Sequence, residues 1–162
     1  MGKKKIKIVF FQIFYCIILA LIIWFFTWKK SPKDVLVEDI AQQFEEKYPE
    51  CNLVRMDELK VKKIFGINAS DYNGYLYYAS EDMMTVDELF LIKIKEDNQK
   101  DSVISIIKDR IEKQKVIFNG YGTNQMDLLR NAVIFSSGKY VCLIVSQKPQ
   151  EWLEMIKEII RV

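Results

Sequence analysis

An apolar run from Ile8 to Trp28 contains no charged residue and limits most strongly what this chain can form. Its 21 residues reach about 31 Å as a helix, at about 1.5 Å of rise per residue. The hydrocarbon core of a membrane is about 30 Å thick, so a run of this length is typical of a transmembrane helix. The sequence therefore predicts a basic tail at residues 1–7, an anchor helix through the lipid bilayer at residues 8–28, and a domain at residues 31–162.

A cleavable secretory signal is the main alternative, because it also follows basic residues. Its apolar stretch is only about 7–15 residues long and ends in small side chains, whereas this run ends in aromatic residues between Trp24 and Trp28. Cys16 lies behind the bulky Phe14 and Tyr15, which argues against lipid attachment there. The sequence favours an uncleaved anchor whose tryptophans suit the membrane interface.

Lysines flank the run on both sides and indicate its orientation. Four lysines and the amino terminus precede it, whereas Lys29, Lys30 and Lys33 follow it. Because basic residues concentrate on the cytoplasmic side, we expect a cytoplasmic N-terminus and an extracytoplasmic domain, with the reverse orientation left open. Ala20 is the only very small residue in the run, so close helix packing has little support, although Gln12 leaves a bond to a membrane partner open.

The domain after the run is acidic. From Ser31 onward 18 basic residues stand against 22 acidic ones, a formal charge of −4, although the whole chain carries +2. Nucleic-acid binding depends on neutralising phosphates, so we expect no nucleic-acid partner. The chain has no histidine, the side chain most used for proton transfer near neutral pH. We predict no enzymatic activity, no metal and no cofactor. Cys51 and Cys142 lack a C-x-x-C spacing, and a disulfide between them is left open.

Hydrophobic periodicity predicts the elements of the domain. In residues 88–95, Phe90, Ile92 and Ile94 alternate with Leu91, Lys93 and Lys95, which is typical of a half-buried strand. The predicted helices start at Ser31, Asp57, Gln99 and Pro149, and the predicted strands are residues 52–56, 75–80, 88–95, 132–135 and 140–145. Strand-strand-helix thus occurs twice, which predicts an α+β fold with a mainly antiparallel sheet and helices packed on one face.

Three stretches carry a family resemblance: residues 65–72 (FGINASDY), 85–93 (TVDELFLIK) and 129–146 (LRNAVIFSSGKYVCLIVS). Through them residues 34–160 resemble an uncharacterised bacterial extracytoplasmic family, a domain of unknown function common in clostridia and their relatives. Its members are mostly small lipoproteins or anchored envelope proteins. The resemblance implies a location in the cell envelope and supplies no activity and no binding residue. This chain departs from the lipoprotein form by its uncleaved helix.

Tyrosine and methionine side chains indicate a candidate contact surface, with core or loop packing as the alternative for each. Strand alternation places two tyrosines on one face, and a tyrosine joins a large ring to a hydroxyl. Two methionines lie in a connection between strands, where flexible thioethers suit a partner surface. A further tyrosine lies in the glycine-rich loop at residues 119–124. The candidate partner-contact residues are Tyr75, Tyr77, Met83, Met84 and Tyr121.

The expected function is therefore a membrane-anchored, extracytoplasmic module of the bacterial cell envelope that binds an envelope protein of unknown identity. An accessory scaffold that joins a membrane complex through its anchor helix is one alternative. A histidine-free envelope enzyme is another, which is less favoured because Asp87 and Glu88 are expected to point to opposite sides of a strand and cannot share one substrate atom.

Overall fold

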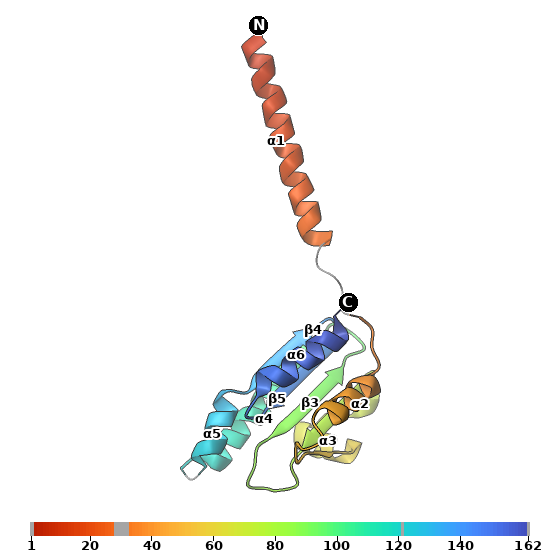
Figure 1. The fold of residues 1–162 in the computed structure, drawn as a ribbon, viewed down its shortest axis with the longest axis vertical. Helices are drawn as coiled ribbons and strands as arrows, with labels where there is room; N and C mark the ends of the chain where they lie inside the picture. The colour runs from red at the N-terminus through yellow and green to blue at the C-terminus, as the bar shows by residue number, and fades with distance from the viewer. Residues whose placement is uncertain (1, 28–32, 121, 162) are drawn as a thin grey trace. The chain divides into compact units, whose positions relative to one another are not determined.

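The computed structural model describes residues 2–27, 33–120 and 122–161. The chain divides into two compact units, Met1–Ser31 and Pro32–Val162, shown in Figure 1. The first unit holds helix α1 (Gly2–Thr27). Over the described residues, no helix combines the length and the apolar character needed to cross a membrane. The predicted run ends at Trp28, outside the described residues, and the membrane anchor stays a prediction.

The second unit is built on a five-stranded sheet in which every neighbouring pair of strands is antiparallel. The strand order is β1-β2-β3-β5-β4. The strands are β1 (Val54–Arg55), β2 (Gly74–Ala79), β3 (Glu88–Lys93), β4 (Val133–Ser137) and β5 (Tyr140–Val145). An α+β fold with an antiparallel sheet is therefore confirmed, and β3 and β5 lie side by side at its centre.

Helices cover both faces of this sheet, so the prediction of helices on one face is wrong. Every residue of β3 and of β5 is buried, and each face therefore needs an apolar cover. Helices α2 (Val37–Lys47) and α6 (Pro149–Ile160) cover one face, in front of the sheet in Figure 1. Helices α3 (Glu58–Phe65), α4 (Gln99–Phe118) and α5 (Thr123–Arg130) contribute to the core on the other face.

Local sequence explains several of these elements. Asp57 caps α3 by accepting the Lys60 backbone N–H at 2.8 Å, and Gly66, with φ of 70°, ends it in the left-handed conformation that glycine tolerates. A short 3-10 turn follows at Ala69–Asp71. The two predicted strand-strand-helix units are present as β2-β3-α4 and β4-β5-α6. Helix α5 was not predicted, because its short sequence follows directly on a glycine-rich turn.

The domain begins with an extended segment instead of the predicted helix start. Ser31 and Pro32 lie outside the described residues, and residues 33–36 are not helical. The Val35 backbone N–H donates to the Tyr140 hydroxyl at 2.7 Å, and the Val35 carbonyl accepts from Lys93 Nζ at 2.7 Å. Because these backbone groups bond across to β3 and β5, they cannot join a helix, and α2 begins only at Val37.

Candidate functional site

The two ends of the sheet differ in what they carry. At one end Lys93 and Tyr140, which are register partners, hold the entering segment through Val35. At the other end Ala79 pairs with Glu88, and Glu88 with Val145. Strands of six residues separate these ends by about 17–20 Å, at about 3.3 Å per residue. The connection between β2 and β3, named here the 80–87 loop, therefore lies away from the entry of the chain.

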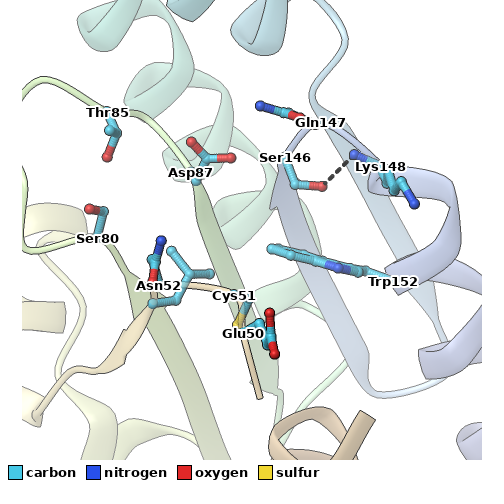
Figure 2. Close-up of a pocket in the computed structure, with 11 residues that line it drawn as sticks. Glu50, Cys51, Asn52, Ser80, Thr85, Asp87, Ser146, Gln147, Lys148 and Trp152 are labelled. Atoms are coloured by element: carbon cyan, nitrogen blue, oxygen red, sulfur yellow. Dashed lines mark hydrogen bonds between the residues drawn. The ribbon is translucent and has the colours of Figure 1, made fainter. Parts of the chain in front are cut away.

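A pocket of about 480 Å³ lies at this far end, on the face covered by α2 and α6. We name it the α6-side pocket. Figure 2 shows Asn52, Ser80 and Asp87 on one side of it and Ser146, Lys148 and Trp152 on the other. These residues come from the ends of β2, β3 and β5, from the segment after α2 and from the start of α6.

The side chains of the α6-side pocket combine a fixed aromatic ring with hydrogen-bonding groups. Trp152 packs edge-on against Phe44 with ring centroids 5.0 Å apart. The buried Ser146 accepts the Lys148 backbone N–H at 3.2 Å through its Oγ. Burial raises the pKa of the half-buried Asp87 carboxyl. Eight of the eleven lining residues are polar or charged, so this pocket is more polar than a usual small-molecule site.

A second pocket, of about 450 Å³, includes side chains of α3 and α4 on the opposite face and also borders the 80–87 loop. We name it the Glu88 pocket. Glu88 is only 2 % exposed. Its Oε2 accepts a hydrogen bond from the Tyr77 hydroxyl at 3.0 Å and another from Arg110 Nη2 at 3.2 Å. With its amide oxygen toward Arg110, Gln114 accepts from Nη1 at 3.1 Å.

Two polar atoms of this cluster have no hydrogen-bond partner among the described residues: Glu88 Oε1 and Arg110 Nε. Burial raises the pKa of the Glu88 carboxyl, although Arg110 and Tyr77 act in the opposite direction. Burial likewise raises the pKa of the Tyr77 hydroxyl. Buried polar groups in folded proteins are nearly always bonded, so the cluster retains hydrogen-bonding capacity for a further group.

The predicted contact residues fall in different environments. Met83 and Met84 lie on the 80–87 loop and are 90 % and 58 % exposed. Tyr75 is half-buried, whereas Tyr77 is buried against Phe65 and Phe90 and lines the Glu88 pocket. Tyr121 lies outside the described residues. The structure thus brings Tyr77 and Met83 to one pocket, and the contact role of all five residues stays a prediction.

Sequence reasoning did not select Glu88, Arg110 or Trp152 as site residues. Glu88 carried one usable signal, since it is a charge directly before the four apolar residues of β3. Arg110 is one of many charged residues on α4, and only the packing of that helix brings it to Glu88. Trp152 reads as a core residue of α6, and it is buried.

The geometry defines a class of protein: a three-layer α+β domain whose sheet ends in two pockets divided by an exposed loop. A family model described as a domain of unknown function, DUF4358, matches residues 37–146. This is more than half of the chain, and the chain belongs to that family. The match runs from α2 through Ser146 and therefore includes all five strands. No curated protein and no solved structure matches the chain.

Proposed function

We propose that this protein is a membrane-anchored, extracytoplasmic binding module of the bacterial cell envelope. Its partner contacts the far end of the sheet, at the 80–87 loop and the pockets beside it. The family match supports the resemblance to an uncharacterised family. The envelope location is the further step that this proposal adds.

The sequence of the uncharged run at residues 8–28 supports the anchor. Residues 12–24 are exposed in the structure, and large apolar side chains such as Phe14, Ile17 and Leu21 are more than 50 % exposed. A helix that is apolar on all sides needs an apolar environment, and an uncharged run of this length suits a bilayer. The four lysines before the run favour an N-terminus in the cytoplasm.

The proposed binding role rests on the structure of the 80–87 loop. It exposes Met83 almost fully, and Ser80, Thr85 and Asp87 line both pockets. The loop is also held in place: the Asp82 carboxylate accepts the Met84 backbone N–H at 2.8 Å, and Gln125 of α5 donates to the Met84 carbonyl at 3.0 Å. An ordered loop that presents flexible thioethers beside two pockets is suited to contact with a partner.

A photo-crosslinking experiment tests this role in the full-length chain in cells. A photoreactive amino acid replaces Met83 in one variant and Leu59 of α3, which is 75 % exposed, in a matched control. We expect one defined protein adduct from position 83 that position 59 does not give. Identical adducts from both positions, or none from position 83, would contradict the proposed role.

A further inference from the structure

We propose that the Glu88 pocket binds a protonated primary amine on an aliphatic stem. This inference rests on the proposed function, because it names a chemical group that the partner-facing end of the sheet receives. A lysine side chain of a protein and a free aliphatic diamine both carry this group, and the experiment below distinguishes these two sources.

The unused oxygen of Glu88 is the first observation. Tyr77 and Arg110 both bond to Oε2, and Oε1 has no partner in the described part of the chain. Glu88 lines the pocket and is only 2 % exposed. A carboxylate oxygen accepts hydrogen bonds, and an ammonium group offers three donors and no acceptor. A small ammonium therefore matches what Glu88 lacks, and because Oε1 is itself buried, binding requires the surrounding side chains to shift.

The charge of the pocket is the second observation. Its lining contains four carboxylates and two basic side chains, a formal charge of −2. The charged residues are Lys60, Glu81, Asp82, Asp87, Glu88 and Arg110. A cleft with a net charge attracts ligands of the opposite sign. A cationic group is therefore favoured over an anion, and over a neutral hydroxyl of the same size.

The apolar lining is the third observation, and it accounts for the aliphatic stem. Met56, Ile64 and Val86 contribute apolar side chains, and the exposed Met83 borders the same pocket. Aliphatic stems of amines pack along apolar surface while the charged head keeps its polar contacts. The volume of about 450 Å³ leaves room for a short stem between the loop and Glu88.

Arg110 offers the competing explanation. Its Nε also has no partner in the part of the chain that the structure describes, and a guanidinium can bind a carboxylate through two parallel hydrogen bonds. A hydrogen bond from Nε to Oε1 would complete such a pair without any ligand. In that case the pocket would show no preference for amines, which the experiment measures directly.

The test uses the full-length protein in detergent micelles with ¹³C-labelled methionine methyl groups. The probes are 1,5-diaminopentane, the lysine derivative N-acetyl-lysine-methylamide, and the neutral diol 1,5-pentanediol. We expect saturable shifts of the Met56 and Met83 methyl signals with the amines and none with the diol. Tighter binding of the lysine derivative indicates a protein side chain as the source, and tighter binding of the diamine indicates a free amine.

Two variants locate the bound group. Glu88→Gln keeps the shape of the side chain and removes its charge, and we expect at least tenfold weaker amine binding. The exposed pair Glu81→Gln/Asp82→Asn leaves the buried cluster intact, and we expect several-fold weaker binding. If Glu88→Gln changes the methyl spectrum of the free protein throughout, that variant is misfolded and the Glu81→Gln/Asp82→Asn variant is used instead. Unchanged amine affinity in Glu81→Gln/Asp82→Asn then overturns the proposal.

Equal shifts with amine and diol, no shifts with any probe, or unchanged affinity in a folded Glu88→Gln variant would each overturn the inference. The crosslinking result separates this failure from a failure of the proposed function. A defined adduct at position 83 without amine binding overturns only the amine inference. Amine binding without an adduct overturns the proposed protein partner and indicates a small-molecule site.

Discussion

Strand β3 carries a buried charge at each end, and both charges have partners. Glu88 is 2 % exposed and bonds to Tyr77 and Arg110. Lys93 is 7 % exposed and bonds to Asp34 at 2.6 Å and to the Val35 carbonyl. Burying a charge is costly unless it is paired and hydrogen-bonded. Glu88 therefore requires α4 to pack against one end of β3, and Lys93 requires the segment at residues 34–35 to pack against the other end.

Removal of one partner of the Glu88–Arg110 pair should destabilise the domain. In Glu88→Leu the Arg110 guanidinium is left buried without its carboxylate, and we expect a loss of about 3 kcal/mol. The double variant Glu88→Leu/Arg110→Met should recover most of this loss, because neither charge remains. Urea unfolding of the full chain in detergent, followed by near-UV circular dichroism, measures both. A double variant as unstable as the single one would contradict the pairing.

The raised pKa of Glu88 also sets a pH dependence. Burial lifts its pKa in the folded state above the ordinary value of 4.5, so the native protein holds this proton at pH values where the unfolded chain has lost it. The contribution of Glu88 to stability is therefore largest below pH 4.5 and falls as the pH rises through the folded pKa. Unfolding free energies of the wild-type protein minus those of Glu88→Gln, from pH 4 to 8, should decrease. A flat or rising difference would show that burial does not dominate.

At the scale of elements, the central strands contact a helical layer on each side. Leu91 lies in the core with α2 and α6, and its neighbour Ile92 lies in the core with α3, α4 and α5. Both side chains are fully buried. Adjacent residues of a strand point to opposite faces, so the two positions report on the two layers separately.

Leu91→Ala and Ile92→Ala should therefore both be strongly destabilising. We expect each to reduce the free energy of unfolding by about 2–5 kcal/mol, as large-to-small changes in a packed core do. Val54→Ala on the exposed edge strand β1 is the control, with an expected change within about 0.5 kcal/mol. The same urea titration measures all three. A small effect at either core position would mean that the helical layer on that face is loosely packed.

The same alternation explains what the sequence could and could not predict about the fold. Hairpins, the capped helix α3 and the long helix α4 follow from local patterns and were predicted. The second helical layer was not, because Lys93 indicated a solvent-facing side of β3, whereas the structure buries it beneath the segment at residues 34–35. The Glu88 pocket was equally hidden, since Tyr77, Glu88 and Arg110 come from β2, β3 and α4 and meet only after those elements pack.

At the scale of the whole molecule, the proposed anchor makes a testable demand on residues 8–28. A lysine at the centre of a membrane helix costs about 2.5–3.5 kcal/mol, so Ile17→Lys/Leu21→Lys should weaken insertion and shift the chain from the carbonate-washed membrane fraction to the supernatant. Leu59→Lys/Val116→Lys adds the same charge at exposed sites of the domain and should leave the fractionation unchanged. If the wild-type chain is found in the supernatant after the carbonate wash, the proposed membrane anchor is contradicted.

The proposal also requires the domain to lie outside the cytoplasm, and this needs its own test because a membrane-anchored domain can face either side of the membrane. In a variant without Cys16 and Cys51, a cysteine in place of Met83 offers a fully accessible thiol, whereas Cys142 is buried. A membrane-impermeant maleimide should label this thiol in intact cells if the four lysines before the run keep the N-terminus in the cytoplasm, as we propose. A cysteine in place of Lys3 should react only after lysis. The opposite labelling pattern would place the 80–87 loop and both pockets in the cytoplasm, where an envelope partner could not reach them.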